Sequence, residues 1–213
     1  MIVKTRVFIG LSIFLMFAAT QASAKTYCGM LGDHKIELDS RYFAMKPDYE
    51  GTSAWESNNF QPKEDCTSKL TVLSVHTNIN TGEPSKPFSE KTFDIILAIR
   101  PAKDNLYLKR ISETIDQNKL NILINDSLDK KIYETKKNKY GGFERKVVYL
   151  DSGHVTEIIE CTFNVISKGN ICELIFDADN YHVSIAGSYE SVRDFDKARS
   201  FSIDFLKKIR INK

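Results

Sequence analysis

The chain has 213 residues, with 30 Lys and Arg, 28 Asp and Glu, and a formal net charge of +2 at pH 7. Nucleic-acid-binding domains normally carry a strong positive excess, so this balance argues against that class of partner. The length is enough for one good hydrophobic core or for two small lobes.

The first 24 residues predict an export signal. Lys4 and Arg6 give a positive start, residues 7–19 form an apolar run, and small residues end at Ala24. We therefore expect cleavage after Ala24 and a periplasmic mature chain of residues 25–213. The apolar run is too short for a membrane span, and no other segment comes near 20 apolar residues. This mature chain holds 28 basic and 28 acidic residues.

All four cysteines lie in the mature part, which indicates an oxidising compartment and two disulfides. Three pairings of four cysteines are possible. We favour Cys28 with Cys66 and Cys161 with Cys172, because each pair is nearest in sequence. A zinc site is the alternative, but there is no Cys-x-x-Cys and no histidine at ligand spacing from a cysteine. We therefore expect no metal and no cofactor.

Residues 47–65 form a long segment without apolar periodicity, and they contain Tyr49, Trp55 and Phe60 among polar residues. Loops of this length are usually either disordered or functional. Trp55 then either packs into the core and holds the loop, or forms an anchor for a partner together with its aromatic neighbours. Tyrosine and tryptophan dominate binding hot spots, so Tyr49, Trp55 and Phe60 are candidate contact residues.

Strands are predicted wherever apolar and polar side chains alternate, because one face of a strand is then buried and the other is wet. A helix is predicted within 102–117, where Leu108, Ile111 and Ile115 recur at helical spacing. The predicted strands are residues 35–38, 42–45, 70–76, 93–99, 120–124, 132–135, 143–150, 159–165, 172–176 and 181–185.

The glycine-rich segment 136–142 predicts the tip of a basic hairpin. Seven basic and two acidic residues lie between Lys130 and Lys146, whereas residues 33–65 hold eight acidic and four basic ones. Such a basic cluster is ordinarily a solvated edge that discourages strand-to-strand aggregation. The alternative is a patch that steers an acidic partner. The candidate contact residues here are Lys136, Lys137, Lys139 and Tyr140.

The segment 154–210 contains the best-defined elements. Asp179 and Asn180 suit a two-residue turn, which places Phe176 opposite Val183 on one face. The loop between the last two cysteines must be wide for their sulfurs to meet, from about residue 163 to residue 170.

A closing helix is predicted from Ser191, which would cap the helix while Asp194 reaches back. Its apolar face must cover a sheet. We therefore expect an α+β fold, with antiparallel sheet or sheets, a C-terminal amphipathic helix packed on the sheet and one middle helix. Residues 25–213 would form a single domain, or two small lobes at 25–125 and 126–213. The helix face comprises Val192, Phe195, Ala198, Phe201, Phe205, Leu206 and Ile209.

The motifs of common enzyme classes are missing, including Gly-x-Ser-x-Gly, His-Glu-x-x-His, phosphate loops and dinucleotide glycines. Residues 151–154 contain Asp, Ser and His, but their position between two strands predicts a turn. The remaining histidines share no spacing. A hydrolase would need a Ser-His pair or two carboxylates brought together in a cleft, so we expect a protein that is not an enzyme.

The C-terminal third resembles the periplasmic immunity proteins of bacterial type VI secretion, and those that guard against secreted lipases most of all. Cys28, which precedes the first strand, is also similar, although it stands in Tyr-Cys-Gly-Met-Leu-Gly rather than in a Cys-Leu-Gly-Arg sequence. The resemblance implies a protein that binds a secreted toxin and occludes its active site with rigid loops. The segments that carry it are 160–161, 171–176, 181–185 and 195–206.

A different class of function also fits the sequence. A periplasmic module that binds a small ligand or a cell-wall fragment would share the export signal and the disulfides. It would differ by a deep apolar pocket and by stabilisation with small periplasmic molecules.

Overall fold

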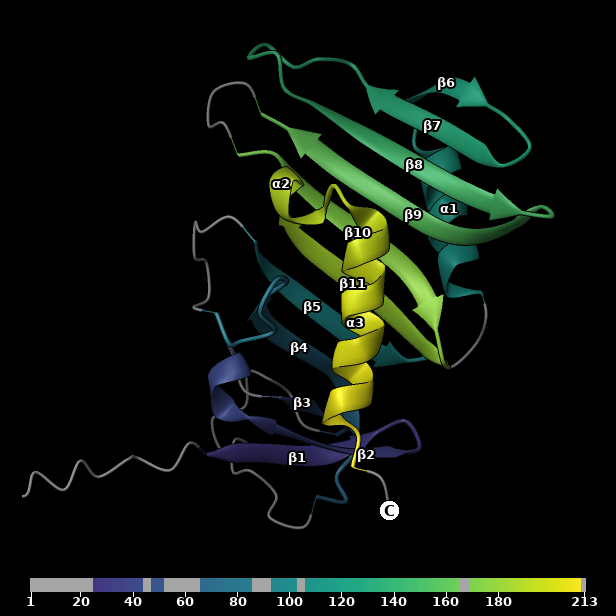
Figure 1. The fold of residues 1–213 in the computed structure, drawn as a ribbon. Helices are drawn as coiled ribbons and strands as arrows, with labels where there is room; N and C mark the ends of the chain where they lie inside the picture. The colour runs from purple at the N-terminus through teal and green to yellow at the C-terminus, as the bar shows by residue number, and fades with distance from the viewer. Residues whose placement is uncertain are drawn as a thin grey trace, which may run out of the picture.

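In a computed structural model, the chain folds into a large twisted sheet with helices on both faces (Figure 1). Trp55, Phe60 and the predicted export signal lie outside the described residues. None of the helices within those residues is long and apolar enough to cross a membrane. The described residues are 25–43, 47–51, 66–85, 93–102, 106–164 and 169–211.

Nine strands form one antiparallel sheet in the order β3-β4-β5-β11-β10-β9-β8-β7-β6, and β1 and β2 form a separate hairpin. The pairing of β5 with β11 joins the first half of the chain to the second. The strands are β1 (Thr26–Leu31), β2 (His34–Asp39), β3 (Asp48–Tyr49), β4 (Leu70–Asn78), β5 (Asp94–Pro101), β6 (Asn121–Asp126), β7 (Lys130–Thr135), β8 (Phe143–Asp151), β9 (His154–Phe163), β10 (Ile171–Ala178) and β11 (Tyr181–Ser188).

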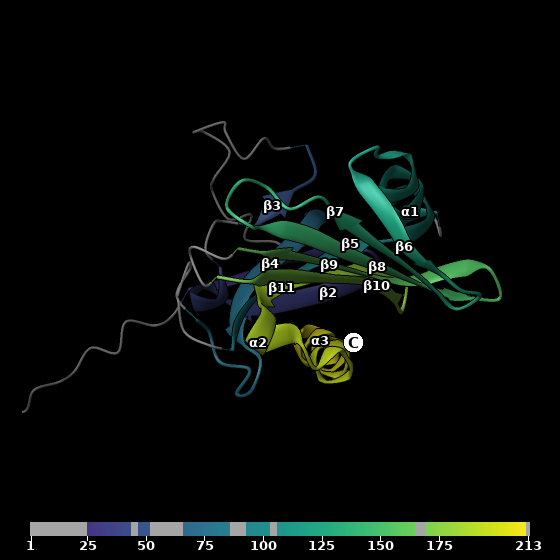
Figure 2. The same ribbon diagram turned by 90° about the horizontal axis from the view of Figure 1, so that it is seen from above.

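The two longer helices, α1 (Tyr107–Gln117) and α3 (Phe195–Ile209), lie on opposite faces of the sheet (Figure 2). Leu108 and Ile115 of α1 are buried in one core cluster with side chains of β7, β8, β9 and β10. The face of α3 lies in the second and larger cluster, with side chains from β1, β2 and most of the sheet. The predicted α+β class, with a middle helix and a C-terminal helix packed on the sheet, is confirmed.

The hairpin of β10 and β11 has the predicted register. Asp179 and Asn180 have φ angles of 48° and 65°, which is the left-handed backbone that a two-residue turn requires. Phe176 accordingly pairs with Val183. On the other side of β10, Cys161 of β9 pairs directly with Cys172. β9 ends at Phe163 and β10 begins at Ile171, as predicted for a connection that lets the two sulfurs meet.

The two disulfides join the pairs expected from the sequence. Cys161 and Cys172 are bonded across neighbouring strands, with their Cα atoms 4.1 Å apart. Cys28 and Cys66 tie β1 to the segment before β4, with a Cα separation of 4.9 Å. Gly29 is needed beside this bond, because a Cβ there would lie 2.9 Å from the carbonyl oxygen of Ser68.

Two local predictions are wrong. Tyr42, predicted to begin a strand, is instead the last residue of a 3-10 helix, η1 (Ser40–Tyr42), because the Asp39 carboxylate accepts a hydrogen bond from the Arg41 amide at 2.8 Å and starts this helix. Ser191 lies inside a separate short helix, α2 (Tyr189–Val192). Asp194 is the residue that caps α3, and its carboxylate accepts from the Lys197 amide at 3.1 Å.

Candidate partner-binding surface

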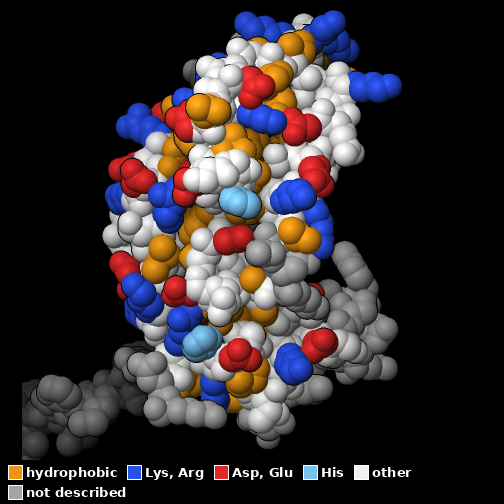
Figure 3. Space-filling model, turned by 90° about the vertical axis from the view of Figure 1, so that its right-hand side faces the viewer, with side chains coloured by type: hydrophobic (Ala, Val, Ile, Leu, Met, Phe, Trp, Pro, Cys, Tyr) orange, Lys and Arg blue, Asp and Glu red, His pale blue; other side chains and the backbone are white. Residues whose placement is uncertain are grey.

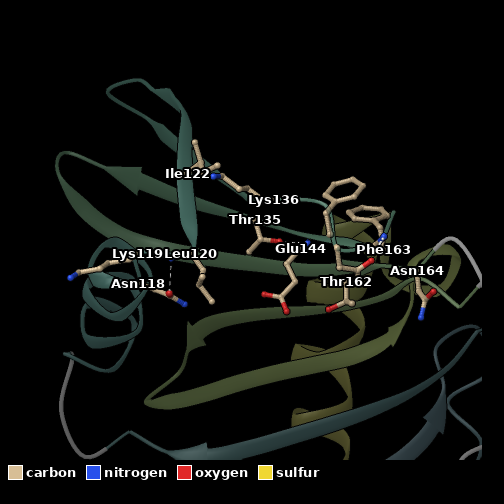
Figure 4. A pocket seen from close by; sticks show the side chains of 13 residues that line it. Asn118, Lys119, Leu120, Ile122, Thr135, Lys136, Glu144, Thr162, Phe163 and Asn164 are labelled. Carbon is tan, nitrogen blue, oxygen red and sulfur yellow. Dashed lines mark hydrogen bonds between the residues drawn. The ribbon is translucent and has the colours of Figure 1, made fainter. Parts of the chain in front are cut away.

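The loop between β7 and β8, residues 136–142, lies at one end of the sheet, and we call it the basic loop. It borders a pocket of about 470 Å³, which the turn from α1 to β6 and the end of β9 also line (Figure 4). Thr135, Glu144 and Thr162 come from three neighbouring strands and point into it. The lining residues are Asn118, Lys119, Leu120, Ile122, Thr135, Lys136, Asn138, Gly142, Phe143, Glu144, Thr162, Phe163 and Asn164.

Asn138 holds the basic loop in one conformation. Its side-chain oxygen accepts hydrogen bonds from the amides of Tyr140 at 2.9 Å and Gly142 at 3.0 Å. The backbone amide of Asn138 donates a hydrogen bond to the Gly142 carbonyl at 2.8 Å. Gly141 has a φ of 80°, a conformation that glycine adopts without strain. The loop is therefore held in shape by its own hydrogen bonds before any partner arrives.

The three lysines of the basic loop are exposed, and none of them has an ion-pair partner among the residues that the structure describes. Two of them lie over aromatic rings: Lys137 Nζ is 5.8 Å from the centroid of Phe143, and Lys139 Nζ is 4.8 Å from that of Tyr140. The neighbouring cation Arg145 is instead paired with Glu134. Three positive charges are therefore available to an anionic partner.

Aromatic side chains lie directly behind these lysines. The rings of Phe143 and Phe163 stack with centroids 4.9 Å apart, and Phe163 contacts Tyr189 at 6.2 Å. We call these three residues the aromatic cluster. Tyr140 is 55% exposed and Ile171 is 59% exposed. Exposed aromatic side chains are typical of the energetically dominant part of a protein interface, and the lysines beside them supply charge that can orient a partner.

The structure brings only some of the candidate residues together. Lys136, Lys137, Lys139 and Tyr140 share the basic loop, and Lys136 also lines the pocket. Tyr49 is only 7% exposed, and its hydroxyl donates to the Cys28 carbonyl at 2.8 Å. Burial accordingly raises the pKa of Tyr49. Its side chain belongs to the core of this structure and is not part of an exposed surface.

Sequence reasoning missed the aromatic cluster and Asn138. Phe143 and Phe163 become neighbours only through the register of β8 and β9, which pairs them directly, and no short-range pattern reveals that register. Asn138 had a local signal, because an asparagine side chain in a turn often bonds to the backbone two residues further along the chain. No local sequence pattern indicated that the turn from α1 to β6 would line the pocket.

A serine, a histidine and acidic groups do meet on β10 and β11, but not as a nucleophile and its base. His182 Nδ1 lies 2.6 Å from Asp177, and the ring of Tyr107 lies 4.3 Å from that of His182. The Ser184 hydroxyl donates to Glu173, so its proton is directed to a carboxylate rather than to an imidazole.

The other expectations about chemistry concern a turn and a metal. Residues 151–154 do form a turn, between β8 and β9, with positive φ at Ser152 and Gly153. Within the described part of the chain, no three His, Cys, Asp or Glu side chains are grouped so as to hold a metal ion.

The fold can be compared with those of known proteins. No family model and no curated protein sequence matches the chain. Its fold is similar to that of an immunity protein of the Stenotrophomonas maltophilia type IV secretion system, with a TM-score of 0.53 and 11% identity over 88% of this chain and 94% of that one. A second similarity, to the iron-regulated outer membrane lipoprotein FrpD of Neisseria meningitidis, has a TM-score of 0.41 and 11% identity over 85% of this chain and 92% of that one. The chain thus has a fold like that of a secretion-system immunity protein.

Proposed function

We propose that the protein is a periplasmic immunity protein, which binds a secreted antibacterial toxin and blocks its active site. The observation that carries this proposal is the basic loop, where three lysines without ion-pair partners in the described residues stand on a backbone fixed by Asn138. The fold similarity supports the class of protein. The toxin would be one that a secretion system delivers, with type VI as the expectation from sequence.

Occlusion is the mechanism that this surface favours. A loop that is already in its bound shape loses little conformational entropy on binding, so more of its contact energy appears as affinity. The lysines would pair with carboxylates around the mouth of the toxin's active site, and Tyr140 would fill a hollow beside them. Such charges raise the association rate and set the orientation of the complex. The protein would need no catalytic residue of its own.

The two disulfides support a periplasmic location, because disulfides form and persist mainly in oxidising compartments. We propose that the export signal is removed after Ala24. Trp55 and Phe60 stay proposed contacts, although they lie outside the described residues.

The test is to mix the purified mature protein with the secreted protein encoded beside its gene. We expect a stoichiometric complex on size-exclusion chromatography and loss of the toxin's activity in that complex. Lys137→Glu should weaken the complex, as should Trp55→Ala. A demonstrated complex that neither substitution weakens would show that the surface is wrong, and the absence of any complex would refute the function.

A second candidate is a module that binds a small ligand or a cell-wall fragment, and the pocket beside the basic loop is the observation in its favour. Most of its lining residues are polar or charged, unlike the deep apolar pocket that this function predicts. Thermal unfolding with and without muropeptides decides between the two. A rise in Tm with muropeptides, and no complex with the secreted protein, would support the binding module.

A further inference from the structure

The outer strand β6 is an unusually apolar sheet edge. Its neighbour β7 pairs with one side of it, and no strand in the described part of the chain pairs with the other. Twelve large hydrophobic side chains are exposed in the described residues, and five of them lie in or beside β6, with exposed fractions from 44% to 98%. These five are Leu120, Ile122, Leu123, Ile124 and Leu128.

The two edges of the sheet are built differently. At the far edge, β3 has only two residues, and Tyr49 within it is buried. A very short strand is one of the devices by which proteins prevent pairing at an edge. The edge at β6 has six residues and neither proline nor lysine, and its protective features are a bulge near Leu123 and one charged side chain, Asp126, at its last residue. An exposed apolar edge of this kind is a template on which another strand can add.

The open edge also continues into the pocket. Leu120 and Ile122 line the pocket together with Lys119 and Lys136, so a strand that pairs with β6 would pass its mouth. Glu144 on the pocket wall offsets at most one of these two charges, and it shares the amine of Lys146, at 3.7 Å, with Glu160, at 3.3 Å. The side chain that best fits this end of an added strand is therefore a carboxylate.

The charge around β6 indicates which kind of strand could add to it. Residues 119–146 hold eight basic and four acidic side chains, and lysines and arginines gather with exposed hydrophobic side chains at this end of the molecule, the top of Figure 3. Two copies of the chain joined edge to edge would bring these like charges together, which costs free energy. An acidic strand from a different protein would gain free energy from the same field.

We propose that β6 is a docking edge for an extended, acidic segment of the partner protein, which adds as a tenth strand and places a carboxylate at Lys119 and Lys136. This inference rests on the proposed function and names the chemistry of the partner's contact segment. The backbone of the added strand would supply affinity, its apolar side chains would cover Leu123 and Ile124, and its acidic residues would supply specificity.

The first arm of the test is hydrogen exchange of the wild-type mature protein, alone and with the secreted toxin. We expect the peptide that covers residues 118–128 to exchange fast in the free protein and to be protected in the complex. The variants Leu123→Glu and Ile124→Glu remove an apolar contact and repel an acidic strand, so they should bind the toxin about tenfold more weakly, whereas Ile211→Glu, which also replaces an exposed isoleucine, should bind normally.

A complex of full affinity in both variants, without protection of 118–128, would overturn the docking edge and leave the immunity function intact. Protection of 118–128 in the free protein, together with a dimer on sedimentation, would also overturn it, since the occupant would then be a second copy.

The second arm does not depend on the toxin, so it separates failure of the docking edge from failure of the proposed immunity function. Two peptides of about ten residues, one alternating valine with glutamate and one alternating valine with lysine, are titrated by fluorescence anisotropy. Binding of the glutamate peptide alone, lost in Leu123→Glu, supports the docking edge even if the toxin forms no complex. Equal binding of both peptides, or of neither, would refute it.

Discussion

Asn138 fixes the basic loop through one side-chain oxygen, which accepts from the amides of Tyr140 and Gly142. We expect Asn138→Ala to weaken toxin binding about tenfold, because a loop without these bonds must be ordered during association. The loop is exposed, so the free energy of unfolding should change by no more than about 1 kcal/mol. Calorimetric titration and urea unfolding of the same variant measure both quantities. A large loss of stability with unchanged affinity would contradict this role.

Tyr133 lies in the smaller core cluster and donates a hydrogen bond to Asp116 of α1. Burial, and then this bond to a carboxylate, raise the pKa of its phenol far above the usual range. The unfolded chain loses the phenolic proton near about pH 10, whereas the folded chain keeps it. Stability is therefore fully present below that pH and is lost as the pH rises beyond it.

Replacement of this phenol tests the pH dependence. Tyr133→Phe should cost about 1 kcal/mol at neutral pH and should flatten the alkaline loss of stability by up to about 1.4 kcal/mol per pH unit. Urea unfolding across the alkaline range measures the slope. Tyr140→Phe, in an exposed residue, is the control and should keep the wild-type slope. An unchanged slope in Tyr133→Phe would exclude this group as the source.

Local chemistry predicted single residues well only where the effect is short-ranged. The turn at Asp179 and Asn180 follows from the backbone that these two residues tolerate. The helix start was misplaced, because Ser191 and Asp194 both have capping side chains. The hydroxyl of Ser191 instead accepts a hydrogen bond from the Phe93 amide at 2.9 Å. Phe93 is distant in sequence, so the residues around Ser191 do not indicate this bond.

At the scale of elements, the two disulfides close loops of different length. Cys28 and Cys66 are 38 residues apart, and Cys161 and Cys172 are 11 apart. A disulfide that closes a longer loop removes more conformational entropy from the unfolded chain. The expected stabilisation of the folded state is about 4 kcal/mol for the first bond and about 3 kcal/mol for the second. We expect the double alanine variant of the first pair to be the less stable in urea. The opposite order would show that packing at β9 and β10 dominates.

Alternation of apolar and polar residues predicted most strands, and apolar residues at helical spacing predicted both longer helices. Both patterns arise because one face of each element is buried. Of the strand predicted at 42–45, the structure describes Tyr42 and Phe43, and Tyr42 belongs to η1, a 3-10 helix that alternation does not encode. The order of the strands in the sheet could not be predicted from the sequence. The pairing of β5 with β11 joins segments about eighty residues apart, and pairing at such distance depends on the whole core.

At the scale of the whole molecule, a mature chain of equal acidic and basic content would concentrate positive charge at one end, around the basic loop and β6. Complementary charge speeds association, and salt screens it. We expect the association rate constant with the toxin to fall about tenfold between about 50 and about 500 mM salt. Stopped-flow measurements should show a much weaker dependence for the triple variant Lys136→Glu, Lys137→Glu, Lys139→Glu. The same salt dependence in both proteins would contradict steering by this loop.

The candidate site was predicted in part, through the charges of the basic loop. Lys136 and Tyr140 stand in a short run whose composition already indicates a charged turn. The pocket and the docking edge could not be predicted, since both depend on where the sheet ends, and β6 becomes an edge only through long-range pairing.

The most direct test of the central claim is the affinity of the toxin for a charge-reversed basic loop, measured by calorimetric titration. Lys137→Glu with Lys139→Glu should weaken binding about a hundredfold, or by about 2.7 kcal/mol. Lys207→Glu with Lys208→Glu, the same change at the exposed end of α3, should leave the affinity within about twofold. Equal affinities for the two double variants would contradict the proposal that the basic loop binds the toxin.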